Sequence, residues 1–235
     1  MTTRSRPADE IRPLRMHLGF TEMTPGSVMI EMGRTRVLCT VVIEPDVPRW
    51  MRDTGKGWVT AEYGMLPGSS SERVGRDQYQ RGRALEISRL IGRSLRSVVD
   101  PVAMGEMMVR VDCDVLQADG GTRTAAITGG WVALHQAFSD SMEKGLLVRH
   151  PILDHVAAIS VGIVDGELLL DLDYEDDARA EVDFNVVMSG RGLLVEVQGS
   201  AEKAPFSREE LDRILDLAAG GIGVLVDAQK QAVAE

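Results

Sequence analysis

Apolar and polar residues alternate along several stretches of the chain with the two-residue period of a β-strand. The clearest stretch is 107–116, where Val109, Val111 and Cys113 alternate with polar neighbours such as Asp112. Because successive side chains of a strand point to opposite faces, this pattern predicts a strand with one apolar face. The same reasoning predicts strands at 28–32, 36–44, 57–63, 107–116, 156–164, 167–171, 181–188 and 193–197.

Three other stretches have the 3.6-residue period of a helix. In residues 83–99 the apolar side chains form one stripe, and several arginines occupy the other faces. A second helix is predicted directly after Gly120-Gly121. A third begins at a capping box formed by Ser207 and Glu210, in which each side chain reaches the backbone N–H of the other residue.

The order of these elements is the same in both parts of the chain, with strands first and a helix after them. The two parts cover roughly residues 10–145 and 155–232. This arrangement implies an α+β fold in which two similar halves of mixed β-sheet carry packed helices. Gly129 and Gly130 fall inside the second predicted helix, which indicates that this helix packs closely against a neighbour.

Composition narrows the class of protein. The chain has 235 residues, of which 44% are hydrophobic and 4% aromatic, so aliphatic side chains must supply most of the core. No apolar run reaches the length of a membrane span, and residues 1–15 lack the apolar segment of a signal peptide. Cys39 and Cys113 lie in apolar strands and are interpreted as buried thiols. We therefore expect a cytoplasmic protein with no membrane partner.

Charge is unevenly distributed. The net charge of −10 argues against a generic nucleic-acid binder. Even so, seven arginines lie within residues 73–96 and nine acidic residues within residues 165–183. These two segments form either a joint site for an anion and a metal ion or two solvated faces, and charge alone leaves both interpretations open. Motifs for a Walker A loop, a dinucleotide site and a nucleophile elbow are absent from the sequence.

The segment Asp119-Gly120-Gly121-Thr122-Arg123-Thr124 is the strongest chemical signal. It connects a predicted strand to the second helix, whose first N–H groups have no partner within the helix. Together with a hydroxyl and a guanidinium, these N–H groups favour a phosphate. Since no nucleotide-binding lysine motif accompanies the segment, inorganic phosphate itself is a candidate reactant. Arg83 opens the first helix and, taken alone, is interpreted as a surface arginine.

Asp177 and Asp183 are six residues apart. An even separation places both carboxylates on one face if the segment between them is extended. Two carboxylates near a phosphate are suited to Mg²⁺ or Mn²⁺, which stabilises charge in an in-line displacement. The alternative is that Asp177 belongs to an acidic turn and that Asp183 is an ordinary outward-facing strand residue.

Several motifs, in a fixed order along nearly the whole chain, resemble those of the RNase PH family of bacterial phosphorolytic 3′-to-5′ exoribonucleases. The most specific motif is residues 112–125 (DCDVLQADGGTRTA). The others are Arg12-Pro13 and residues 57–67 (GWVTAEYGMLP), 86–96 (EISRLIGRSLR), 171–177 (DLDYEDD), 182–187 (VDFNVV), 196–199 (EVQG) and 206–208 (FSR).

The resemblance implies a fold like that of ribosomal protein S5 domain 2, as one domain over residues 1–235, and a homohexameric ring built as a trimer of dimers. It implies trimming of precursor tRNA 3′ ends, with rRNA left open as a further substrate. Inorganic phosphate would be the co-substrate and nucleoside diphosphates the products, and the reaction would be reversible as nucleotide addition.

The resemblance also assigns roles to residues. The family's phosphate-binding positions are matched by Arg83, Gly121, Thr122 and Arg123. Its acidic pair, assigned to catalysis and to binding Mg²⁺ or Mn²⁺, is matched by Asp177 and Asp183. Its tRNA-guiding loop is matched by Arg73 and Arg76, and further RNA backbone contacts are expected from Arg89, Arg93 and Arg96.

The chain departs from the family pattern at several places, and two of them bear on the site and on RNA. The segment Arg81-Gly82-Arg83 is shorter than in relatives, and Gly68 replaces a basic loop residue, which should weaken contact with RNA. Two alternatives to an active homohexameric enzyme remain. One is a subunit of an exosome-like ring that needs a different partner chain, and the other is an RNA-binding scaffold that has lost turnover through the shortened Arg81–Arg83 segment.

Overall fold

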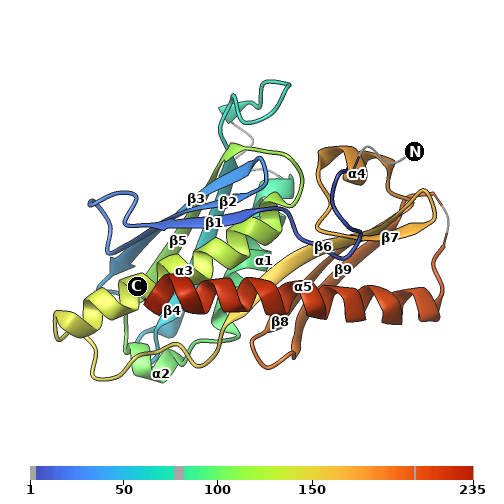
Figure 1. Ribbon diagram of the computed structural model, residues 1–235. Coiled ribbons are helices and arrows are strands. Elements are labelled where there is room, and N and C mark those ends of the chain that lie inside the picture. Colours follow the sequence, from blue (N-terminus) through green and yellow to red (C-terminus); the bar gives the residue numbers. More distant parts are fainter. Residues whose placement is uncertain (1–3, 77–81, 204, 235) are drawn as a thin grey trace.

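Two β-sheets are formed by the residues that this computed structural model describes, 4–76, 82–203 and 205–234 (Figure 1). The first sheet has the strand order β1-β2-β3-β5-β4, and its neighbouring strands are antiparallel except for the parallel pair β4 and β5. Its strands are β1 Leu14–Leu18, β2 Gly26–Met32, β3 Thr35–Glu44, β4 Trp58–Met65 and β5 Met108–Gln117.

The second sheet has the strand order β7-β6-β8-β9 and is antiparallel in every pairing that the described residues make. The sequence predicts mixed sheets in both halves, so this expectation is confirmed for the first sheet and wrong for the second. The α+β class and the succession of strands and helix in each half are confirmed. The strands are β6 Val156–Val164, β7 Glu167–Leu170, β8 Val182–Ser189 and β9 Leu194–Ala201.

Helices connect and cover the sheets. Helix α1 packs on β4, α3 packs on β2 and β3, and the long helix α5 runs beside α3 and across β6 (Figure 1). The helices are α1 Gly82–Arg96, α2 Pro101–Met104, α3 Thr122–Glu143, α4 Tyr174–Arg179 and α5 Arg208–Ala234, with a short 3₁₀ helix at Arg49–Met51. None of the helices in the described ranges is long and apolar enough to cross a membrane.

Helix α3 is buried because most of its residues over the first five turns are apolar or small. Close packing at Gly129 is confirmed, since a Cβ atom there would lie 2.6 Å from Cγ2 of Ile30 on β2. The thiols of Cys39 and Cys113 are buried and free, as predicted, and both face the backbone carbonyl of Ala126 on the same helix. The glycine and the small side chains thus let the helix lie directly on the sheet.

Buried hydrogen bonds between α5, α3 and β6 join the two halves of the protein. Gln229 of α5 is fully buried, and its Nε2 donates to the carbonyl oxygens of Thr128 on α3 and Val156 on β6, at 3.0 and 2.9 Å. The hydroxyl of Thr128 accepts a hydrogen bond from the backbone N–H of Ala158 on β6 at 3.2 Å. Since unpaired buried polar groups are costly, these bonds fix how α3 lies against the second sheet.

Four elements of the described ranges are missing from the sequence predictions, namely β1, the 3₁₀ helix, α2 and α4. Helix α1 also ends at Arg96 instead of Val99, because Val98 and Val99 form turn hydrogen bonds to Leu95 and Arg96. Val99 then pairs with Ile152 in an isolated bridge. The capping box at the start of α5 is confirmed: Ser207 N–H donates to Glu210, and Glu210 N–H donates to the Ser207 hydroxyl.

Candidate active site

A cleft of about 730 Å³ lies between the two sheets, at the start of α3. It is lined by elements of both halves: the end of β5 and the loop after it, the starts of α1 and α3, the helix α4 and the strand β8. Lining residues from the first half include Ser69, Ser70, Arg83, Gly120, Gly121, Thr122 and Arg123, and those from the second include Tyr174, Asp177, Asp183 and Asn185. The predicted phosphate-binding residues and the predicted carboxylates therefore share one cleft.

The start of α3 is open to an anion. Gly121 is the N-cap residue and has φ of 64°, and Gly120 before it has φ of 75°. Both values lie in the left-handed region, which favours glycine. A Cβ atom on Gly120 would also lie 2.6 Å from the carbonyl oxygen of Leu172, so packing requires glycine there as well. Because Gly121 has no side chain to cap the helix, the N–H groups of its first turn are available to a ligand.

A buried ion pair supports this loop from below. The guanidinium of Arg12 donates to both carboxylate oxygens of Asp171, at 2.9 and 2.7 Å, and to the carbonyl oxygen of Asp119. The Thr35 hydroxyl donates to the carbonyl oxygen of Gly120 at 2.6 Å. Burial opposes the charge of Arg12, but its hydrogen bonds to Asp171 and the charge of that carboxylate raise its pKa overall. Two carbonyl groups of the loop are thus held by donors, which fixes the loop's orientation.

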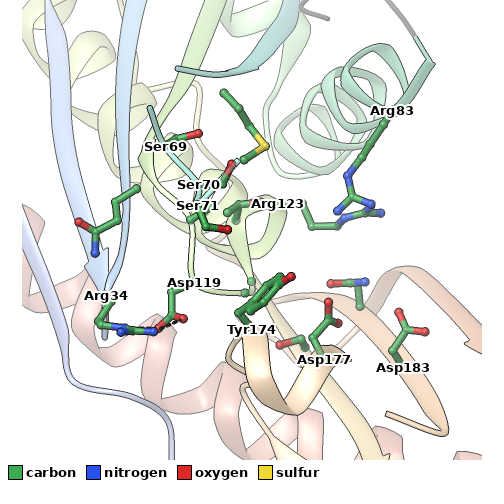
Figure 2. A pocket seen from close by; sticks show the side chains of 18 of the residues that line it. Arg34, Ser69, Ser70, Ser71, Arg83, Asp119, Arg123, Tyr174, Asp177 and Asp183 are labelled. Atoms are coloured by element: carbon green, nitrogen blue, oxygen red, sulfur yellow. Dashed lines mark hydrogen bonds and ion pairs between the residues drawn. The ribbon is translucent and has the colours of Figure 1, made fainter. Parts of the chain in front are cut away.

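Arg83 and Arg123 bring positive charge to the cleft. Figure 2 shows Arg83 reaching from α1 towards the cleft, with Asp177 and Asp183 on the opposite side. Burial lowers the pKa of Arg123, and the nearby charge of Arg83 lowers it further. An anion between two neighbouring guanidinium groups would relieve this repulsion. Arg83 thus lines the cleft as expected for a phosphate ligand, whereas Arg81 lies outside the described residues.

Asp177 and Asp183 reach the cleft by a route that the sequence did not predict. Asp177 lies on α4 and Asp183 on β8, so the expected shared extended segment is wrong. Helix α4 forms because the Asp173 side chain caps its start by accepting from Asp176 N–H at 2.9 Å. The interpretation of Asp177 as part of an acidic turn is closer to the structure, yet the side chain still lines the cleft.

The environment of both carboxylates disfavours their negative charge. Burial raises the pKa of Asp177, while Arg83 and Arg123 act in the opposite direction. Burial also raises the pKa of Asp183, and the charge of Asp177 raises it further. Hard oxygen donors that crowd one another in this way suit a divalent cation. No cluster of three or more His, Cys, Asp or Glu side chains placed for a metal is found in the described ranges, so such an ion would need water or phosphate oxygens as well.

Sequence reasoning missed Tyr63 of β4. Its hydroxyl forms a 2.8 Å hydrogen bond with the Thr122 hydroxyl at the start of α3. Burial is the main reason that the pKa of Tyr63 is raised, so its hydroxyl is neutral. The contact links residues 59 positions apart, and the alternating pattern of β4 signals only that Tyr63 is on a buried face.

The five arginines predicted to bind RNA are not among the described residues that line the cleft. Arg73 and Arg76 are exposed on the loop after β4. Arg89, Arg93 and Arg96 line a separate groove of about 550 Å³ beside β4. Within it, Arg96 stacks on Trp58 and donates to the carbonyl oxygen of Val59, and Arg93 is paired with Glu196. Contact of these five arginines with RNA stays a prediction.

Two protein-family models match this chain, and together they span most of it. Residues 10–139 match "3' exoribonuclease family, domain 1" and residues 154–221 match "3' exoribonuclease family, domain 2". The chain belongs to the 3′ exoribonuclease family. Proteins named Ribonuclease PH from Brucella ovis and Brucella canis are each 56% identical to it over 239 aligned residues. Each alignment covers 100% of this chain and 100% of the relative. The predicted membership of the RNase PH family is thereby confirmed.

Solved structures of low sequence identity share the fold. A chain of the Archaeoglobus fulgidus exosome with RNA bound to its active site superposes with a TM-score of 0.80 at 20% identity, covering 97% of this chain and 91% of that one. Rice (Oryza sativa) Rrp46 superposes with a TM-score of 0.77 at 17% identity, covering 97% and 98%. At these identities the likeness supports the α+β fold of this family and carries no statement about activity.

Proposed function

We propose that this chain is a phosphate-dependent 3′-to-5′ exoribonuclease that trims precursor tRNA ends and releases nucleoside diphosphates. The observation that carries the proposal is the cleft, in which an open helix start with Arg83 and Arg123 faces Asp177 and Asp183. The family membership and the full-length similarity to proteins named Ribonuclease PH support the same activity.

In the proposed reaction, inorganic phosphate binds at the first turn of α3, between the N–H groups there and the guanidinium groups of Arg83 and Arg123. One phosphate oxygen forms a bond to the phosphorus of the last phosphodiester of the RNA. The bond from that phosphorus to the 3′ oxygen of the preceding nucleotide breaks. The products are a nucleoside diphosphate and an RNA that is one nucleotide shorter.

The carboxylates have two proposed roles. Asp177 and Asp183 would hold Mg²⁺ or Mn²⁺, an ion that, when bound, offsets negative charge on the transferring phosphoryl group. Their raised pKa also suits either residue to donate a proton to the departing 3′ oxygen. Tyr63 would fix the Thr122 hydroxyl towards the phosphate through their hydrogen bond.

The proposal includes the protein's setting. We expect a cytoplasmic homohexamer, arranged as a trimer of dimers, in which several arginine patches gather around the RNA. This assembly would explain how an acidic chain holds a polyanion. The exosome-like alternative needs a second kind of chain, so the molar mass of the purified protein separates the two: a stable homo-oligomer rules out an obligatory different partner.

The test is a short RNA with a single-stranded 3′ tail, incubated with and without inorganic phosphate. Diphosphate release that requires phosphate supports the enzyme, whereas monophosphate release or no release contradicts it. Arg123→Ala should abolish the reaction, and the exposed Arg52→Ala should leave it unchanged. Asp183→Asn should still bind the RNA but lose metal-dependent turnover; an unaltered metal titration would rule out the carboxylate role.

A further inference from the structure

The guanidinium of Arg123 contacts two side chains: it forms a hydrogen bond with Gln198 of β9 and an ion pair with Glu86 of α1. Neither belongs to the described residues that line the cleft. We infer that Gln198 and Glu86 are positioning residues with opposite effects on the affinity for phosphate. Gln198 raises the affinity by fixing the guanidinium of Arg123, and Glu86 lowers it by offsetting the positive charge of Arg123. The inference rests on the proposed role of Arg123 as a phosphate ligand.

Both ends of the Gln198 amide are engaged. Its Oε1 accepts from Nη1 of Arg123 at 2.9 Å, and its Nε2 donates to Oε1 of Glu86 and to Oε1 of Glu196, each at 3.0 Å. Guanidinium nitrogens only donate and carboxylate oxygens only accept, so this orientation of the amide is the one that satisfies all three neighbours. The amide therefore fixes the position of Nη1 of Arg123.

The amide is itself anchored to α1. Glu196 lies two residues before Gln198 on β9, so both side chains are on the same face of that strand. Its carboxylate accepts two hydrogen bonds from Nη2 of Arg93 at 2.8 Å and one from Nε at 3.0 Å. A continuous polar chain thus runs from Arg93 through Glu196 and Gln198 to Arg123. Because it ties α1 to β9, the position of Arg123 depends on both halves of the protein.

Glu86 acts mainly through charge. Its carboxylate lies 3.5 Å from Nη1 of Arg123, and its side chain is 45% exposed against 15% for Arg123. Burial and the charge of Arg83 lower the pKa of Arg123, and Glu86 opposes both effects. The carboxylate therefore stabilises the charged guanidinium of Arg123 beside Arg83 while phosphate is absent. Once phosphate is bound, the same negative charge repels it.

These roles predict opposite effects on the KM for phosphate. Gln198→Ala removes a hydrogen bond to a charged group, so the KM should rise roughly tenfold. Glu86→Gln keeps the size of the side chain and an acceptor oxygen but removes the charge, so the KM should fall by a factor on the order of three. The KM for RNA should stay unchanged in both variants, which separates positioning of Arg123 from a general loss of structure.

The experiment measures kcat, the KM for inorganic phosphate and the KM for one tailed RNA in the parent protein and three variants. The third variant is Glu143→Gln, an exposed carboxylate at the opposite end of α3, which should match the parent. Opposite shifts of the phosphate KM support the inference. It is overturned if Gln198→Ala behaves like Glu143→Gln, or if Glu86→Gln raises the phosphate KM.

Failure of the proposed function gives a different result. In that case the parent releases no diphosphate from RNA, or Arg123→Ala keeps the parent's activity, and the positioning inference falls with it. If the parent is phosphorolytic and Arg123→Ala is inactive, the KM shifts test the inference alone. Should Gln198→Ala unfold on thermal melting, Gln198→Asn withdraws the amide by one methylene and carries the same expectation.

Discussion

Replacing Asp171 with asparagine is expected to destabilise the fold by about 3–5 kcal/mol, because the substitution removes the ion-pair partner of the buried Arg12. Asp171 is fully buried, and the Arg12 side chain is 5% exposed. The carboxylate accepts the Arg12 backbone N–H at 2.8 Å as well as two guanidinium hydrogen bonds. Asparagine has the same shape, but its single acceptor oxygen cannot satisfy all three donors.

Asparagine is chosen over alanine because Asp171 has φ of 55°, in the left-handed region that asparagine tolerates and alanine does not. The chain offers a matched control in Asp165, which has φ of 51° and also pairs with an arginine, Arg179. The Asp165 side chain is 54% exposed, so its ion pair is screened by water. Asp165→Asn should therefore cost less than about 1 kcal/mol.

Urea unfolding followed by circular dichroism measures both variants. With a dependence of about 2 kcal/mol per molar urea, a loss of 4 kcal/mol moves the midpoint down by about 2 M. Asp165→Asn should move it by less than about 0.5 M. Equal midpoints for the two variants would refute the reasoning, because they would show that burial of the Arg12–Asp171 pair adds nothing to its contribution.

Two further predictions concern helix α3. The His135 ring lies against those of Trp131 and His150, and burial lowers its pKa to about 4. The unfolded chain therefore binds a proton at His135 more readily than the folded chain, so stability should fall as the pH drops from 6.5 towards about 4. Urea midpoints at about pH 7.5 and about pH 5 that coincide would contradict this prediction. Gly129→Ala places a methyl group 2.6 Å from Ile30 and should cost about 1–3 kcal/mol. Gly220→Ala in the interior of α5, where space is open, should instead stabilise by up to about 1 kcal/mol, and a thermal melt compares the two.

The strands other than β1, and the long helices, could be predicted to within a few residues, because each carries a regular apolar pattern. Helix α4 could not, since its sequence Tyr174–Arg179 is short and mostly charged and its start depends on a cap from Asp173. This explains why Asp177 was placed on an extended segment. Local charge patterns indicated the right segment but not its conformation.

The members of the cleft could be named from motifs, whereas their supports could not. Gly121 and Arg123 stand in a local pattern that indicates an anion site by itself. Asp171 contacts Arg12 across 159 positions, and Gln198 contacts Arg123 across 75. Contacts between residues so far apart leave no periodic trace in a single sequence, so such supporting side chains become visible only in the folded chain.

Substitutions at the hydrogen bonds from Gln229 to α3 and β6 are expected to change the reaction rate although they lie far from the cleft. Thr128, where α3 is held, is six residues from Thr122, or roughly 9 Å along the helix axis. A tilt of about 5° around that point would move the helix start by nearly 1 Å relative to the second sheet, a displacement of the kind that costs about a hundredfold in rate. Variants that weaken the hydrogen bonds of Gln229 are therefore expected to have a lower kcat although every residue of the cleft is unchanged.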